Sequence, residues 1–341
     1  MSHLDDKQDN IPVIDVSNPS EKVAQQVLEA ASKNGFLYIK NDGAIIPPQD
    51  IDDMFRLSKD FFASPKEQKA EYAIHSDKAG GMNRGWSPFQ QGDPKEAFNI
   101  APPQPTLQPL PSPLSASTPL ISRFQTSCHT LCTRILSLLS TALQISEADY
   151  FSKRHDQSLG PSGSIFRLLY YPKTLPKQDE GNAQKTSIRA GAHSDYGSVT
   201  LLFRLPGQPG LELLTQTGTW IPVPVNPSPD TLPHPPILVN IGDLLCYWTN
   251  GLLKSTVHRV SFEGGGEERY SMAYFCHPLD EARLDAVPSR LIDEFGREGK
   301  GEEELKSQRK RLGLSEHGDG ADEIITAKGH LERRLKVTYG I

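Results

Sequence analysis

The sequence predicts a mainly β protein with flanking α-helices, whose core is an antiparallel sandwich or barrel such as a jelly roll. After Ala148, short runs of β-branched and aromatic residues alternate with turns rich in glycine and proline. Before that point, apolar residues recur mainly at the spacing of amphipathic helices. The totals of 28 prolines and 27 glycines in 341 residues also favour many turns over a helical bundle.

The N-terminal part is expected to alternate short strands with helices. Residues 11–16 and 36–39 are short runs rich in Ile, Val and aromatic side chains, which favour strands. Residues 21–33 and 51–62 carry apolar side chains at helical spacing, and Asn34-Gly35 ends the first of these helices.

The middle of the chain combines loops with one long helix. We expect a loop over residues 80–86 and an irregular, proline-rich connector over residues 101–120. Residues 121–144 form the longest helical pattern. Cys128 and Cys132 lie within it, but no second Cys/His pair completes a zinc site, so we expect buried structural thiols.

The second half of the chain supplies the strands of the expected barrel. They cover residues 164–171, 198–203, 211–214, 220–225, 237–241, 255–262 and 270–276. From Leu291 the chain is charged and expected to be helical, including the polar residues 302–311. Residues 324–337 are expected to form a last helix against the barrel.

Composition excludes several classes of protein. Lys plus Arg total 36 against 42 for Asp plus Glu, a formal charge of −6, which argues against nucleic acid or an anionic membrane as the main partner. The apolar runs are too short to span a bilayer, and the N-terminus is polar and acidic. Four cysteines are too few for a disulfide framework in a chain of this length. These features predict a soluble, cytoplasmic protein.

His193 and Asp195 form the first candidate site. They are two residues apart, so in an extended segment both side chains lie on one face and could reach one metal ion. The pattern alone decides nothing, since it recurs at His3/Asp5, His75/Asp77, His317/Asp319 and His330/Glu332. Only the pair at 193 and 195 is followed by an expected strand of the β-rich half.

His258 is the candidate third ligand, because alternation along residues 255–262 places it on one face with Thr256 and Val260. Taken alone, such a histidine is more often a hydrogen-bonded core residue. Two histidines and one carboxylate, however, make the triad that leaves positions open on Fe(II). A closed structural zinc site would need four ligands.

Arg269 and Ser271 form a second candidate site on the following strand. They are two residues apart, so a guanidinium and a hydroxyl face the same way and could hold a carboxylate. Tyr171, at the end of an earlier strand, could donate to the same carboxylate. The competing interpretation is a surface arginine paired with Glu267 or Glu268.

Taken in order, these residues resemble the iron(II)/2-oxoglutarate-dependent dioxygenases. The similar branch contains isopenicillin N synthase, plant flavonoid and gibberellin oxygenases, and fungal thymine hydroxylase. The resemblance covers most of the chain, and one departure is Leu169, where many relatives carry an asparagine. Its further matching segments are residues 11–15, 35–39, 168–172, 240–244, 248–251 and 254–260.

The resemblance implies a double-stranded β-helix (jelly roll) core wrapped by N- and C-terminal helices. It implies that Fe(II) is held by His193, Asp195 and His258. It also implies that the distal carboxylate of 2-oxoglutarate is bound by Arg269 and Ser271, with Tyr171 assisting. O2 is the other cosubstrate, and ascorbate is the expected reductant. The substrate would be a small organic molecule, oxidised by hydroxylation, desaturation or cyclisation with release of succinate and CO2.

The same resemblance divides the chain into four segments of one globule. These are an N-terminal dioxygenase segment (residues 1–120), a long helix and connector (121–160), a jelly-roll core (161–285) and a C-terminal helical extension (286–341).

Two other functions remain open alongside this one. An oxidase of the isopenicillin N synthase type would use the Arg-x-Ser pair to grip its substrate, without 2-oxoglutarate. A non-catalytic jelly-roll binding protein would be expected to lack a ligand. Either nucleobase or secondary-metabolite chemistry fits the resemblance. Candidates to line the substrate pocket are the C-terminal helix and the loop residues Arg84, Trp86, Phe89 and Arg189, with exposed structural roles as the alternative.

Overall fold

The larger of two β-sheets forms the centre of the molecule. The computed structural model describes residues 11–88, 95–173, 187–230, 232, 234–262, 267–314 and 325–339. Within them the larger sheet has eight strands, in the order β1 (Val13–Ile14), β2 (Phe36–Ile39), β10 (Ile237–Ile241), β7 (Val199–Arg204), β12 (Arg269–Cys276), β5 (Ile165–Tyr171), β4 (Glu96–Ile100) and β3 (Gly85–Ser87). Apart from the parallel pair β1 and β2, neighbouring strands are antiparallel.

A smaller sheet faces the larger one across a shared apolar interior. Its strands are β6 (Ser187–His193), β11 (His258–Phe262), β8 (Leu211–Leu214) and β9 (Trp220–Pro222). Side chains of both sheets meet in one cluster, here called the interior cluster, which includes Phe36, Tyr38, Leu169, Tyr171, Ala190, Leu211, Leu213, Leu238, Val260 and Ala273. Two sheets closed over such a core make the jelly roll, and the sequence-based fold class is confirmed.

Alternation along the strands gives the larger sheet two different faces. On β5, Leu168 lies in the outer core while Leu169 lies in the interior cluster. On β12, Met272 and Tyr274 point outward and Ala273 points inward. The inner face is therefore available for a site, while the outer face must be covered by helices.

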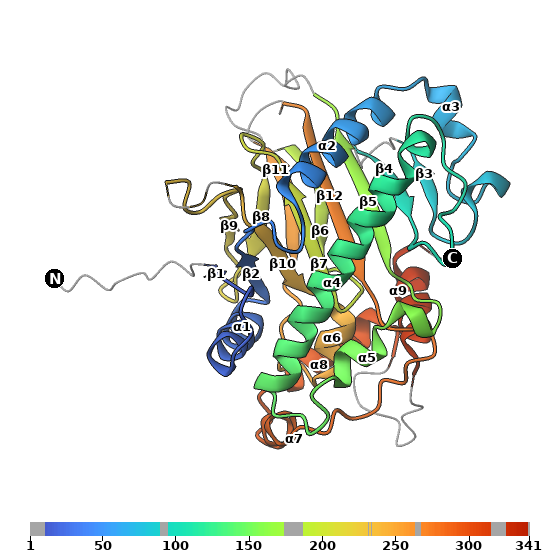
Figure 1. Ribbon diagram of the computed structural model, residues 1–341. Helices are drawn as coiled ribbons and strands as arrows, with labels where there is room; N and C mark the ends of the chain where they lie inside the picture. Colours follow the sequence, from blue (N-terminus) through green and yellow to red (C-terminus); the bar gives the residue numbers. More distant parts are fainter. Residues whose placement is uncertain are drawn as a thin grey trace, which may run out of the picture.

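Helices cover that outer face, with α4 (Thr118–Ala142) running diagonally across the sheet (Figure 1). Phe124 of α4 is fully buried and contacts Phe166 and Phe203, with ring centroids 5.3 and 5.1 Å away. The helices on the N-terminal side of α4 are α1 (Glu21–Lys33), α2 (Pro48–Phe62) and α3 (Lys66–Ala70). The expected helices over 21–33, 51–62 and 121–144 correspond to α1, α2 and α4.

The C-terminal helices gather at one end of the sheets (Figure 1). They are α7 (Arg290–Arg297), α8 (Glu302–Arg311) and α9 (Ala327–Tyr339), all in the part of the chain expected to be helical. Two short helices, α5 (Tyr150–Arg154) and α6 (Asp243–Trp248), were not expected. Helix α6 follows β10 directly and packs against α8.

The structure corrects three expectations about strands. Residues 80–86 are not wholly a loop, because Gly85–Ser87 pairs with β4, and β4 pairs in turn with β5. Strand β6 was missed as well. Strand β11 begins at His258 rather than at 255, so the argument that Thr256 shares its strand face does not hold. Short strands of this kind exist because a neighbour offers a free edge, which no local pattern reveals.

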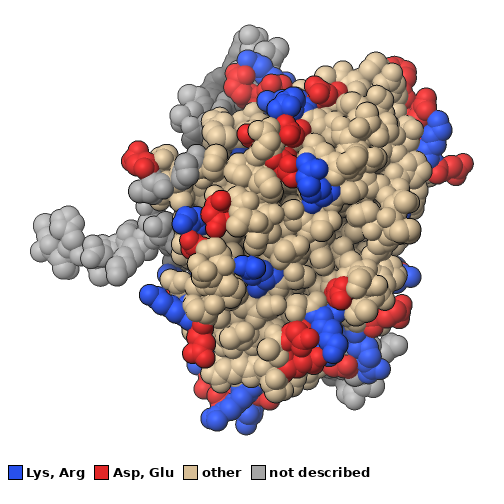
Figure 2. Space-filling model, viewed as in Figure 1, with Lys and Arg blue, Asp and Glu red and all other residues tan. Residues whose placement is uncertain are grey.

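Among the described residues, none of the helices is both long and apolar enough to cross a bilayer. The face shown in Figure 2 carries acidic and basic side chains interspersed around a large uncharged area. Cys128 and Cys132, expected to be structural thiols, are free and buried, and so are Cys246 and Cys276.

Replacing Phe124 by alanine should cost about 3–5 kcal/mol of unfolding free energy, because the cavity would lie between a helix and a rigid sheet. Denaturant unfolding followed by circular dichroism measures this loss. The matched control is Met82→Ala, which removes an exposed side chain (56% exposed) and should change stability by less than about 0.5 kcal/mol. Equal losses in the two variants would contradict the assigned docking of α4.

Candidate metal centre

Three of the sequence-predicted residues meet where the end of β6, the turn that follows it and the start of β11 come together. His193 and His258 are directly opposite each other in the β6–β11 pair, and their ring centroids are 4.4 Å apart. Asp195 follows in the turn, with Oδ1 3.8 Å from Nε2 of His258. One ligand atom from each residue lies within 4.8 Å of the other two, a spacing that suits one shared metal ion.

Hydrogen bonds to carbonyl groups orient both imidazoles. Nδ1 of His193 lies 2.7 Å from the carbonyl oxygen of Gly191, and Nδ1 of His258 lies 3.1 Å from that of Thr256. Because a carbonyl oxygen only accepts, each Nδ1 carries the proton and each Nε2 keeps its lone pair for a metal.

Asp195 is oriented by two donors that sequence reasoning did not assign. The hydroxyl of Thr200 and the side-chain amide of Asn240 both donate to Oδ2, each at 2.7 Å. Oδ1 is thereby left toward His258. The signal for Asn240 was present, since it begins a segment matched to the dioxygenases, but its partner could not be read from the sequence.

The electrostatics favour the unprotonated forms of Asp195 and His193 that a metal requires. Burial opposes ionisation of Asp195, yet His258, His193, Asn240 and Thr200 outweigh it and lower the pKa of that carboxyl. Desolvation by the surrounding protein atoms, and then the nearby His258, lower the pKa of His193. Because His193 is exposed, water reduces this desolvation, but its pKa is still lowered. Protons therefore compete weakly with a metal near neutral pH.

The second predicted site lies in the same interior. Arg269 is 1% exposed, its Nη1 donates to Oγ of Ser271 at 3.1 Å, and its guanidinium carbon lies 5.2 Å from the ring centroid of Tyr171. Burial lowers the pKa of the guanidinium. The competing surface ion pair is excluded for Glu267, which pairs with Lys173 instead.

Arg269 has bonding capacity that the protein does not use. Its Nε is buried and has no hydrogen-bond partner among the described residues. Burying a guanidinium with an unused donor is costly, so an anionic ligand is expected to complete the site. A carboxylate matches the guanidinium and the hydroxyl of Ser271 in charge and in hydrogen bonding.

A second cationic side chain, Arg167, which sequence reasoning missed, lies at the metal end of the same face. Arg167 alternates with Leu169 and Tyr171 on β5 and is half-buried, with its guanidinium carbon 5.1 Å from the ring centroid of Phe275. Phe275 is opposite Thr200 in the β12–β7 pair. Arg167 therefore lies two strand spacings, roughly 10 Å, from the strand that carries Thr200.

Arg167 is fixed through Nε, which leaves its two terminal nitrogens available to a ligand. Its Nε donates to Oδ1 of Asn99 at 2.7 Å, and Asn99 in turn donates to both the carbonyl and the side-chain oxygen of Asn83. Asn83 has φ 56°, a left-handed conformation that asparagine tolerates. The terminal nitrogens of Arg167 have no partner among the described residues, so they are free to bind a ligand.

Three of the residues suggested as pocket lining have partners within the protein. Trp86 belongs to the outer core and donates through Nε1 to Glu96, and Arg84 donates to the carbonyl of Gly80 in its own loop. Arg189 is buried and donates to the carbonyl of Pro172. Phe89 lies outside the described residues, as do the pairs His3/Asp5 and His317/Asp319.

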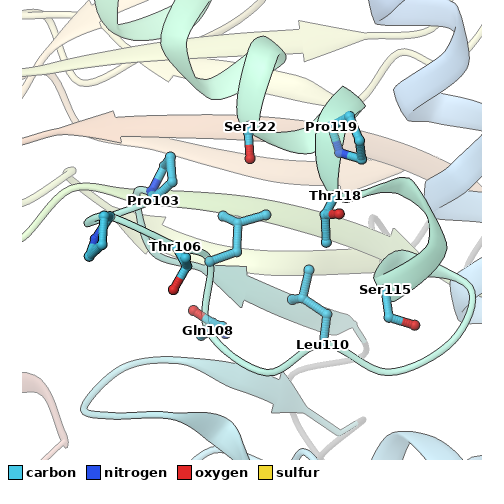
Figure 3. A pocket seen from close by; sticks show the side chains of 10 residues that line it. Pro103, Thr106, Gln108, Leu110, Ser115, Thr118, Pro119 and Ser122 are labelled. Carbon is cyan, nitrogen blue, oxygen red and sulfur yellow. The ribbon is translucent and has the colours of Figure 1, made fainter.

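A pocket of about 400 Å³ lies on the other, helix-covered side of the sheet (Figure 3). Prolines of the connector and the first turns of α4 line it, among them Pro103, Leu110, Thr118 and Ser122. It contains none of the groups described above. Chemistry is therefore expected in the barrel interior rather than here.

Family models match both halves of the chain. Residues 11–119 match the model described as non-haem dioxygenase in morphine synthesis N-terminal, and residues 162–278 match the 2OG-Fe(II) oxygenase superfamily.

Curated proteins and solved structures agree with these matches. A UPF0676 protein of Schizosaccharomyces pombe is 35% identical, over 97% of this chain and 93% of its own. A proline hydroxylase of Petromyces alliaceus is 30% identical, over 80% of this chain and 86% of its own. The solved structure of a full-length Neurospora crassa protein in complex with alpha-KG and thymine has a TM-score of 0.72 and 26% identity, covering 96% of this chain and 97% of that one.

Removing the groups that orient Asp195 should weaken metal binding without removing a ligand. Asn240→Leu and Thr200→Val each delete one hydrogen bond to Oδ2, and each should lower the affinity for Mn(II) by roughly 10- to 100-fold. Calorimetric titration of the folded variants measures the change. Thr217→Val, which alters an exposed hydroxyl in the β8–β9 turn outside the site, is the control. Wild-type affinity in both site variants would show that Asp195 needs no such support.

Proposed function

The chain belongs to the 2OG-Fe(II) oxygenase superfamily, and on that premise we propose that it oxidises a C–H bond of a small organic molecule at an iron ion held by His193, Asp195 and His258. The protein is an oxidoreductase whose cofactors are those of the superfamily: Fe(II), 2-oxoglutarate and O2. When bound, iron would activate O2, the oxidant; oxidation of 2-oxoglutarate to succinate and CO2 would supply two of the four electrons that O2 takes up, and the substrate C–H bond would supply the other two.

One observation carries this proposal: the unused Nε of buried Arg269 shares the barrel interior with the three candidate metal ligands. A two-histidine, one-carboxylate donor set leaves coordination positions open. A cosubstrate that chelates the metal at one end can therefore place its distal carboxylate on Arg269 and Ser271 at the other. We propose that Tyr171, directly opposite Arg269 in the β12–β5 pair, closes the side of this pocket.

The protein's own part in the reaction is binding and orientation. The hydrogen bonds to Gly191 and Thr256 hold the two imidazoles with Nε2 toward the ion, and Thr200 and Asn240 hold the carboxylate. The apolar interior cluster excludes water around the cosubstrate, which strengthens the attraction between its carboxylate and Arg269.

For the substrate, we propose a small, flat molecule that carries a carboxylate or ring carbonyl groups. Arg167 presents two nitrogens without described partners, and the adjacent Phe275 offers an aromatic surface. The similar Neurospora crassa protein was solved with thymine, and another structure of it holds 5-formyluracil, which supports the size and polarity of this class.

Replacing Arg269 by glutamine should raise the KM for 2-oxoglutarate by roughly 10- to 100-fold, since a charge-assisted hydrogen bond is lost. Succinate formation with Fe(II) and ascorbate, without added substrate, measures this, and His258→Ala serves as the blank. Arg283→Gln, at an exposed ion pair, is the matched control. Oxygen consumption that does not depend on 2-oxoglutarate would instead favour an oxidase.

A metabolite panel tests the proposed substrate class. Carboxylates and cyclic carbonyl compounds should stimulate succinate formation, whereas amines and plain hydrocarbons should not. For any compound that stimulates, Arg167→Gln should raise the half-saturating concentration by about tenfold or more. Arg84→Gln, which alters a guanidinium bound within its own loop, should not. Stimulation that is insensitive to Arg167 would refute this subsite.

A further inference from the structure

The carboxylate of Asp243 is fully buried and binds two guanidinium groups from the C-terminal helices. Nη1 of Arg311 on α8 lies 2.7 Å from Oδ1, and Nη2 of Arg334 on α9 lies 2.9 Å from Oδ2. The hydroxyl of Ser255 and the amide of Gln308 donate to Oδ1 as well. Well-packed apolar residues often stabilise a fold at least as much as a buried ionic cluster of this kind. The cluster is therefore better explained by the groups that it holds in place.

This cluster is bonded directly to the turn that carries the proposed metal-binding carboxylate. The main-chain N–H of Asp243 donates to the carbonyl of Asp195 at 2.7 Å. Ser194 donates to Oδ2 of Asp243 at 2.9 Å and accepts from Nη1 of Arg311 at 3.1 Å. Both the main chain and the side chains of the turn are therefore held by the same carboxylate residue.

The residue on the other side of Asp195 is held by α9. The guanidinium carbon of Arg334 lies 4.4 Å from the ring centroid of Tyr196, and the hydroxyl of Tyr196 donates to Oγ1 of Thr338 at 2.9 Å. Arg334 and Thr338 are four residues apart on α9, so they lie on one face of that helix. Helix α9 thus contacts the turn at two points of one aromatic side chain.

The turn is packed so closely that its position depends on what surrounds it. A Cβ at Gly242 would lie 2.2 Å from the carbonyl oxygen of Gly197 and 3.1 Å from that of Asp195. Among the three candidate ligands, Asp195 alone lies outside a strand, because β6 ends at His193 and β11 begins at His258. Sheet register therefore places the two histidines but not the carboxylate.

We propose that Asp243, Arg311 and Arg334 are positioning residues that set Asp195, so that the C-terminal helices determine the affinity of the metal site. The inference rests on the proposed function, since it requires Asp195 to be a ligand. It assigns a role to helices that contribute no side chain to the triad. The chain beyond the jelly roll then acts on the iron site through one buried carboxylate.

The test compares metal affinity with stability. Arg334→Gln removes one guanidinium from Asp243 and from Tyr196, and it should weaken Mn(II) binding by roughly 10- to 100-fold. Arg334→Lys, which keeps the charge, should recover part of the loss. Calorimetric titration measures the affinity, and thermal unfolding of the metal-free protein reports whether each variant is folded. Arg290→Gln, at an exposed ion pair of α7, is the matched control.

A second, milder change guards against variants that fail to fold. Tyr196→Phe and Thr338→Val each delete the same single hydrogen bond, and both should weaken Mn(II) binding to a similar, smaller extent. Wild-type affinity in Arg334→Gln and in both milder variants, with only a lower unfolding temperature, would overturn the inference. If wild type and His258→Ala bind Mn(II) equally, the proposed function itself fails.

Discussion

The register between β6 and β11 is the constraint on which the candidate metal centre depends. The antiparallel ladder places His193 opposite His258, so main-chain hydrogen bonds set the separation of the two imidazoles. A slip of one residue would turn one ring to the other face of the sheet. Strand β11 also pairs with β8 on its other side, so His258 is held in a ladder on both edges.

Inside the barrel, polar groups divide into those that the protein satisfies and those it does not. Nδ1 of each histidine and Oδ2 of Asp195 have partners within the chain. Nε of buried Arg269 has no hydrogen-bond partner among the described residues, and one ligand atom each from His193, Asp195 and His258 lies within 4.8 Å of the others. Because burying an unsatisfied polar group is costly, the interior favours ligands that complete these groups. The unsatisfied groups therefore mark the barrel interior as the place where ligands bind.

The chain distributes these tasks over distant segments. The jelly roll supplies the histidines through sheet pairing, while the carboxylate sits in a turn that contacts α6, α8 and α9. Helices α1, α2 and α4 cover the outer face and leave the interior to the site. The position of Asp195, two residues after the end of β6, thus depends on helices α8 and α9, which lie more than a hundred residues later in the chain.

The sequence by itself determined the fold class, the long helices, and the candidate residues His193, Asp195, His258, Arg269, Ser271 and Tyr171. These depend on local periodicity and on the order of a few residues along the chain, which a sequence shows directly. Only the tertiary structure decided the partners of those residues. Asn240 and Asp243 lie in a segment that resembles the dioxygenases, and Arg167 lies in an ordinary strand pattern, but the partners of all three come from segments far apart in the chain. Strands β3, β4 and β6 were hidden for the same reason, because pairing with a neighbouring strand, rather than a local pattern, makes them strands.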